Sequence, residues 1–414
     1  MTSLSGFWDQ EISTLSTTRF PSTIPQSSAG HTQQQEQQRS RPIRNAQPQD
    51  LQRIEYCPED TYQTVASFIG GAKAQTNLIR ATKTNKLFVC KHLYATYTTQ
   101  GCISHGQTPR EAKLPLGILA GPHPNIVVLF AGRNSIQGRY RLYMEYCSGG
   151  DLNRQIHYFA HLDQSAFGAF PVVRYDQEWR VRNLVTTPRM GTVPDFHVPA
   201  VVLLHVAAEL IDALAFIQHG LHPNDSGVYK GGKEGHVPVI HGDIKPENIL
   251  LRWPQDECYA GLPQIVLADF GAAKVASKTR GICGTKVYNS PEVLRMAHLR
   301  EHDLPQFERL RYMPVMTTTS DIYQLGHVLH VLATYALFPV GEQPGRAKFP
   351  AAYNATSCGL WVLEELMQSC FQVEAKKRPT AAKMRSKGVG FRAQVKHMLS
   401  ENGSLPRGVW KNSN

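Results

Sequence analysis

One short segment constrains this chain more than any other. The ten residues HGDIKPENIL run from His241 to Leu250, and the tripeptide DFG follows at Asp269. Asp243 can accept a proton and Lys245 can bind a phosphate. Asn248 and Asp269 can bind a metal ion, and the spacing of 21 positions between them leaves room for two short strands. These are the side chains that phosphoryl transfer needs.

The pattern H-x-D-x-K-x-x-N followed by D-F-G resembles the catalytic loop and metal-binding loop of eukaryotic protein kinases. The resemblance implies an α+β fold of two lobes, a small N-terminal lobe with an antiparallel sheet and a mainly helical C-terminal lobe. It also implies ATP and Mg²⁺ as cofactors. Asp243 is then the catalytic base, Lys245 contacts the transferred phosphoryl group, and Asn248 and Asp269 are the metal ligands.

Lys91 matches the family's nucleotide-binding lysine, because the sequence VCK ends a predicted strand at that residue. In the family this lysine pairs with a glutamate on the small-lobe helix. Glu111 is the one acidic residue between Lys91 and Glu145, so it is assigned to this pair. Glu111 also completes a T-x-x-E capping box with Thr108, and it could instead cap its own helix.

The sequence departs most from the family in the loop that covers the phosphates. The three glycine positions of that loop fall on Ile69, Gly71 and Ala74, with Gly70 beside the surviving glycine. Glycine allows backbone amides to approach a phosphate closely. We therefore expect Gly70, Gly71 and Ala74 to contact the nucleotide, with reduced affinity for ATP.

The segment YMEYCSGGDL resembles the hinge between the two kinase lobes. The resemblance implies that Met144 borders the adenine pocket and that backbone groups of Glu145 and Cys147 bond the base. It places Asp151 where an acidic side chain meets the ribose. Taken alone, GGDL is an ordinary turn followed by a helix cap.

The stretch GTKVYNSPE, residues 284–292, resembles the end of the kinase activation segment. In that pattern Thr285 and Lys245 together are typical of kinases that phosphorylate serine or threonine. Farther along, Asp321 matches the buried acid that holds the catalytic loop, and Arg378 matches the arginine that pairs with Glu292.

Gly242 stands where most regulated kinases carry an arginine next to the catalytic aspartate. That arginine gains a counter-charge when the activation loop is phosphorylated. Since it is absent here, we expect activity without phosphorylation of Ser277 or Thr279.

The predicted kinase domain spans residues 62–385, with an N-lobe at 62–145 and a C-lobe at 146–385. Short runs rich in β-branched and aromatic residues predict the N-lobe strands, and a helix is predicted near 108–119. Stretches near 161–197 and 221–235 are interpreted as loop insertions. Residues 1–55, rich in Ser, Gln and Pro, are predicted to be disordered, and 386–414 is interpreted as a C-terminal tail with room for one helix.

Composition excludes several other classes. The eight cysteines form no CxxC pair, and the N-terminus lacks a signal-peptide pattern, so a cytoplasmic or nuclear location is expected. The most apolar stretch, residues 198–217, contains His205, Glu209 and Asp212, which argues against a membrane span and a membrane partner. The pairs His157/His161 and His327/His330 lack a third ligand at metal-site spacing.

The formal net charge of +11 could attract nucleic acid, but no nucleic-acid motif accompanies it. We expect instead a protein substrate, with a modest preference for acidic sequences, and leave the oligomeric state open. Two alternatives to a protein kinase remain. Small-molecule phosphotransferases also use an H-G-D…N loop, although they generally lack the activation-segment ending, and a pseudokinase would bind partners without turnover.

Overall fold

The computed structural model describes residues 61–68, 74–93, 110–113, 123–134, 140–167, 198–222, 235–253, 261–276, 284–294, 316–339, 342–350, 353, 360–403, 405 and 410. The predicted N-terminal tail, Gly70, Gly71 and most of the two predicted insertions lie outside these residues. Ser277 and Thr279 also lie outside them.

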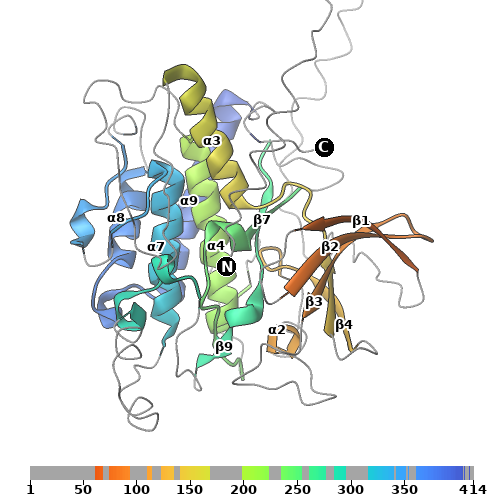
Figure 1. Cartoon of the computed structure of the whole chain (residues 1–414). Coiled ribbons are helices and arrows are strands. Elements are labelled where there is room, and N and C mark those ends of the chain that lie inside the picture. Colours follow the sequence, from red (N-terminus) through yellow and green to blue (C-terminus); the bar gives the residue numbers. More distant parts are fainter. Residues whose placement is uncertain are drawn as a thin grey trace, which may run out of the picture.

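A five-stranded antiparallel sheet forms the N-lobe (Figure 1). Its strands are β1 (Tyr62–Phe68), β2 (Ala74–Ala81), β3 (Leu87–Leu93), β4 (Leu129–Asn134) and β5 (Tyr140–Glu145), in the order β1-β2-β3-β5-β4. The helix α2 (Arg110–Lys113) lies in the region where a helix was predicted. Small apolar clusters hold the sheet, one of them centred on Phe88 and Tyr143.

The strand predicted from the run IVVLFAG begins three residues later than expected, because its first residues pair elsewhere. Ile126 forms a parallel bridge with Leu267, and the Val127 amide donates to the Leu267 carbonyl at 3.0 Å. Residues 126–127 therefore bond to the C-lobe, and β4 starts only at Leu129.

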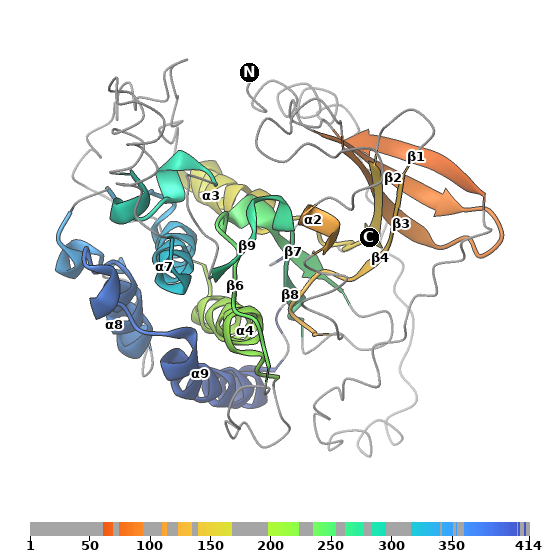
Figure 2. The ribbon, with the colours of Figure 1, turned by 90° about the horizontal axis from the view of Figure 1, so that it is seen from below.

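The C-lobe is mainly helical, as the resemblance implied (Figure 1). Its helices are α3 (Leu152–Phe167), α4 (Ala200–His219), α7 (Thr318–Thr334), α8 (Leu360–Cys370) and α9 (Ala381–Asn402). The antiparallel strands β7 (Ile249–Arg252) and β8 (Gln264–Leu267) are the two strands expected between Asn248 and Asp269. A second short pair joins β6 (Val239–Ile240) to β9 (Lys274–Val275). Figure 2 shows α2 and the β7–β8 pair between the sheet and the helices.

Helix α4 forms the centre of the C-lobe. It begins directly after Pro199 and ends at Gly220, whose φ of 67° is left-handed and favours glycine. Its length and apolar composition would also suit a membrane span, but 83% of its most apolar window is buried inside the protein. Helix α4 is therefore the core helix of this lobe.

Two predicted boundaries are wrong. Helix α3 continues to Phe167, so the insertion placed near 161–197 begins later than expected. The tail boundary at residue 385 falls inside α9, which packs along α4 and buries Phe391 and Val395. Beyond it, Trp410 is buried and donates its Nε1–H to the Gly261 carbonyl at 2.7 Å. Residues 386–402 therefore belong to the folded C-lobe.

Candidate active site

The catalytic loop, residues 241–248, connects β6 to β7 and is anchored to α7. The carboxylate of Asp321 is fully buried and accepts the backbone N–H groups of His241 at 2.9 Å and Gly242 at 2.8 Å. Burial raises the pKa of Asp321, while the neighbouring His241 and the two backbone amides oppose the rise. The predicted contact between Asp321 and the catalytic loop is present.

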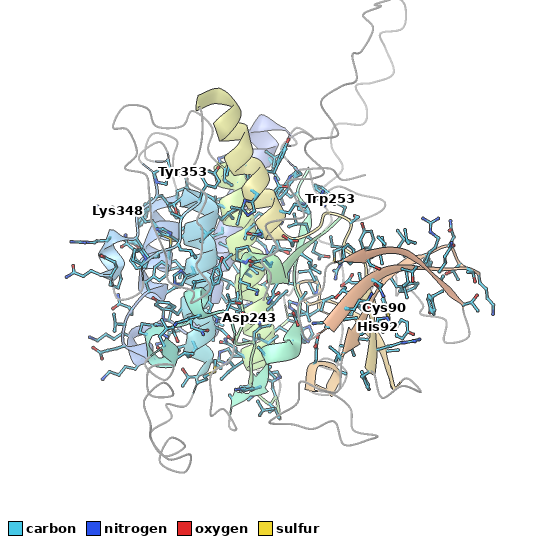
Figure 3. The ribbon with its side chains drawn as sticks, in the orientation of Figure 1. Cys90, His92, Asp243, Trp253, Lys348 and Tyr353 are labelled. Atoms are coloured by element: carbon cyan, nitrogen blue, oxygen red, sulfur yellow. The ribbon has the colours of Figure 1, made fainter. Side chains whose placement is uncertain are left out.

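Asp243 lies on the catalytic loop (Figure 3), and side chains of this loop and of the activation segment surround it. The Thr285 amide donates to Asp243 Oδ1 at 2.7 Å. Lys245 Nζ lies 2.8 Å from Thr285 Oγ1 and 3.6 Å from Asp243 Oδ2. The Asn248 amide nitrogen donates to the Asp243 carbonyl at 2.7 Å, and it lies 3.2 Å from Asp243 Oδ2. The loop thus presents a carboxylate, an ammonium group and an amide together.

Two N-lobe residues and Asp269 of the C-lobe form a charged triad. Lys91 Nζ lies 2.5 Å from Glu111 Oε1 and 2.9 Å from Asp269 Oδ1. Strand β3 carries Lys91, α2 carries Glu111, and Asp269 precedes a short turn of 3-10 helix, Phe270–Ala272. The structure therefore joins residues that are 178 positions apart in the sequence. The predicted Lys91–Glu111 ion pair is present. Its role in phosphoryl transfer stays a prediction.

Burial and neighbouring charges set the protonation of this triad. Burial would lower the pKa of Lys91, but the carboxylates of Glu111 and Asp269 outweigh burial and raise it. Burial would likewise raise the pKa of Asp269, but the Lys91 ammonium holds it at about 2. Burial raises the pKa of Glu111 against the pull of Lys91. Asp269 is therefore the more firmly anionic of the two carboxylates.

Asp269 has a left-handed backbone, with φ of 60°, and its Oδ1 accepts the Gly271 amide at 3.2 Å. The aromatic ring of Phe270 packs edge-on against His241, with ring centroids 4.9 Å apart. The Nε2 atom of His241 lies 3.0 Å from the Ala268 carbonyl oxygen. These contacts fix the DFG tripeptide on the catalytic loop.

The donor set fits magnesium bound to a nucleotide. Asp269 is anionic, and 43% of its side chain is exposed. Asn248 uses its amide nitrogen on Asp243, so its amide oxygen is the atom available to a metal ion. Carboxylate and amide oxygens suit Mg²⁺, and Lys91 would supply a cation for the phosphates. Asn248 and Asp269 would hold the ion, and the ion would neutralise charge on the transferred phosphoryl group.

The hinge residues occupy the end of β5 and the start of α3. The Glu145 amide donates to the Val128 carbonyl at 3.0 Å, so this amide is already bonded within the protein. Glu145 is 5% exposed, and its side chain pairs with Arg252, with Nε at 2.7 Å from Oε2. Asp151 caps α3 by accepting the Arg154 amide at 2.8 Å, so the helix-cap interpretation of GGDL holds.

Met144 lies on β5 directly before Glu145, and Cys147 is buried just after it. Ala74 is the first residue of β2 and pairs with Leu93. The contact of Met144, Cys147 and Ala74 with a nucleotide stays a prediction.

The end of the activation segment is tied to the C-lobe by a buried ion pair. Arg378 has no exposed side-chain surface, and it binds both carboxylate oxygens of Glu292 at 2.7 Å. Ser320 donates to the same carboxylate at 2.9 Å. The predicted Glu292–Arg378 pair is therefore present, and it serves the structure of this segment.

Sequence reasoning missed two groups of residues. Arg252 neutralises the buried Glu145 carboxylate across 107 positions of sequence, and no local pattern identifies such a partner. Gln324 on α7 accepts a hydrogen bond from the Ile244 amide of the catalytic loop, and it donates one to Asn289 of the activation segment. A glutamine in a helix and an asparagine in a loop resemble ordinary surface residues. Among the described residues there is no cluster of three metal-binding side chains, and His327 and His330 have aromatic neighbours instead.

Comparison with known proteins agrees with this geometry. Residues 233–388 match the protein kinase domain family. The chain is 27% identical to the serine/threonine-protein kinase ATG1 of Debaryomyces hansenii over 54% of this chain and 21% of that protein. It is 26% identical to the G2-specific protein kinase nimA of Emericella nidulans over 63% of this chain and 32% of that protein.

A third relative, human activin receptor type-2A, is 34% identical over 37% of this chain and 27% of the receptor. The chain thus spans between about a fifth and a third of the length of these relatives. The two-lobed α+β fold and the matched domain define a protein kinase fold. The matched region and these relatives support a relationship to the eukaryotic protein kinase superfamily.

Proposed function

We propose that this protein is an ATP-dependent kinase that transfers the γ-phosphoryl group to serine or threonine hydroxyls of a protein. The observation that carries the proposal is the convergence of Asp243, Lys245 and Thr285. The Thr285 amide donates a hydrogen bond to the Asp243 carboxylate at 2.7 Å, and this bond orients the carboxylate. An oriented carboxylate can accept the proton of the attacking hydroxyl, and Lys245 can stabilise charge on the phosphoryl group.

The contact of 2.8 Å between Lys245 and the Thr285 hydroxyl supports a serine or threonine acceptor. The resemblance to serine/threonine kinases carries the same implication. Lys91, held by Glu111, supplies a cation for the inner phosphates, and Asn248 and Asp269 supply ligands for Mg²⁺. Each required role has a residue at the junction of the lobes.

A protein acceptor is favoured over a small molecule by the activation segment. The segment is anchored at its end by the Glu292–Arg378 ion pair, and nearer the active site by the hydrogen bond from Thr285 to Asp243 of the catalytic loop. A segment fixed at both places gives a platform for a peptide chain. Lys286 is exposed on this platform and Lys274 is partly exposed on β9, which supports a modest preference for acidic substrates that weakens at high salt.

The test is an assay of the purified chain with Mg²⁺, γ-labelled ATP and two kinds of acceptor, a mixed protein substrate and a panel of small hydroxylated molecules. We expect label on protein, and phosphopeptide mass spectrometry should place it on serine or threonine. Label on the small molecules alone would support a small-molecule phosphotransferase. Nucleotide binding without transfer to any acceptor would support a pseudokinase, and predominant phosphotyrosine would contradict the acceptor assignment.

A further inference from the structure

A buried amide contact joins the catalytic loop to α7 beside Asp243. Asp321 and Gln324 lie three residues apart on α7, so they share one face of the helix. Gln324 is 1% exposed. Its Oε1 accepts the Ile244 amide at 2.8 Å, and its Nε2 donates to the Gly242 carbonyl at 3.3 Å. The helix therefore bonds the backbone on both sides of Asp243.

The same glutamine also reaches the activation segment. Its Nε2 lies 3.3 Å from Oδ1 of Asn289, which is 2% exposed and follows Thr285 by four residues. Thr285 donates its amide to Asp243. Gln324 thus touches the loop that carries the carboxylate and the segment that orients it.

Two glycines allow the loop and the segment to meet. Gly242 and Gly284 both have left-handed backbones, with φ of 77° and 81°. A side chain at Gly284 would collide with the Gly242 carbonyl oxygen. Because Gly242 has no side chain to hold the segment, the neutral amides of Gln324 and Asn289 make this connection. They require no phosphate to do so.

We propose that Gln324 and Asn289 are positioning residues that orient Asp243 by fixing the activation segment on the catalytic loop. The inference rests on the proposed phosphoryl transfer, because it assigns a role within that reaction. Buried polar groups hold one geometry firmly when each has a partner, since an unpaired buried amide is costly. The carboxylate is then correctly placed in the unphosphorylated protein.

The test uses Gln324→Met, which keeps the length of the side chain and removes its polar atoms, and Asn289→Leu. We expect each to lower kcat at least about tenfold while KM for ATP changes by less than about threefold, since positioning and not nucleotide binding is lost. The double variant should lose little more than Gln324→Met alone, because both changes break one connection. Gln368→Ala serves as the control, since Gln368 bonds the Ala347 carbonyl far from the loop.

Hydrogen exchange provides a readout that does not depend on activity. Peptides that contain residues 241–246 and 284–290 should exchange faster in Gln324→Met than in the wild type, with no change in Gln368→Ala. Unchanged kcat, or unchanged exchange in both peptides, would overturn the inference. A wild-type protein without Asp243-dependent transfer would contradict the proposed function instead, and the exchange measurement would still decide whether Gln324 holds the loop.

Discussion

At the scale of single residues, Asp243 and Asp269 are both carboxylates at one junction, but they have different partners. Asp243 accepts a hydrogen bond from the Thr285 amide. Asp269 instead pairs with Lys91, whose ammonium group lowers the pKa of Asp269 and keeps it anionic. The first arrangement suits a base that orients a hydroxyl, and the second suits a metal ligand. This difference allows the two roles to be separated by experiment.

We predict that Asp269→Asn weakens magnesium-dependent nucleotide binding at least tenfold, because the variant loses a charged metal ligand. Asp243→Asn should bind nucleotide nearly as the wild type does. The measurement is the rise in melting temperature caused by ATP and Mg²⁺, compared with ATP alone. Equal nucleotide-dependent stabilisation of the two variants would show that this division of roles is wrong.

His327 gives a second residue-scale prediction. It lies in a cage of aromatic rings that includes Tyr288, Tyr323 and Phe371, with centroids 5.8, 5.1 and 5.0 Å away. Burial, with a smaller contribution from His330, lowers its pKa to about 3. The folded protein therefore keeps His327 neutral while the unfolded chain protonates it below about pH 6.5. Stability is full above that pH and falls as the pH drops toward 3.

We predict that, when the pH falls from 7.5 to 5.0, the free energy of unfolding decreases by about 2 kcal/mol more in the wild type than in His327→Leu. The measurement is the free energy of unfolding in urea at both pH values. His397→Leu, at an exposed position on α9, is the control. If the wild type and His327→Leu lose the same stability over this range, His327 does not remain neutral in the folded protein.

At the scale of elements, the activation segment is held by contacts that contain no phosphate. Its described end binds Asp243 through Thr285 and Arg378 through Glu292. By the resemblance to protein kinases, Gly242 stands at the position of an arginine that would respond to a phosphate. We predict that phosphatase-treated protein, and the Ser277→Ala/Thr279→Ala variant with Thr285 intact, keep activity within about tenfold of the untreated wild type. A loss above about a hundredfold in both, or about 2.7 kcal/mol of transition-state stabilisation, would contradict this.

Helix α9 belongs to the core of the C-lobe, although its sequence resembles a tail. Asp212 on α4 is 1% exposed and pairs with Arg385 and Arg392 of α9. Gly388 faces Ile211 of α4 and permits close packing of the two helices. Glycine lowers helix propensity, which is why the sequence around Gly388 and Gly390 gives a weak helical signal.

We predict that a chain ending at residue 385 does not fold cooperatively. The truncation exposes the face of α4 and removes the burial of Phe391 and Val395, each of which contributes about 1.5 to 3 kcal/mol. Total stabilities of domains are only about 5 to 15 kcal/mol. The measurement is thermal unfolding by circular dichroism, with a chain ending at Trp410 as control. A cooperative transition at the wild-type temperature in the shorter chain would refute the prediction.

At the scale of the whole molecule, the resemblance correctly predicted a two-lobed fold, and the roles of the motif residues stay predictions. Lys91, Asp243 and Asp269 could be located because short motifs fix them within a few positions of chain. The partners Arg252 and Gln324 could not, since they depend on how β7 and α7 pack against segments far away in sequence. Strand β4 begins later in the sequence than predicted, because Ile126 pairs with Leu267 of the other lobe.

The proposed phosphate transfer depends on Asp243 as the base. The most direct measurement compares the initial rate of phosphate transfer to protein by the wild type and by Asp243→Asn, with saturating ATP and Mg²⁺. We predict a fall of about 10² to 10⁴ in rate, with unchanged melting temperature and unchanged nucleotide-dependent stabilisation. A variant that transfers phosphate at the wild-type rate would contradict the account.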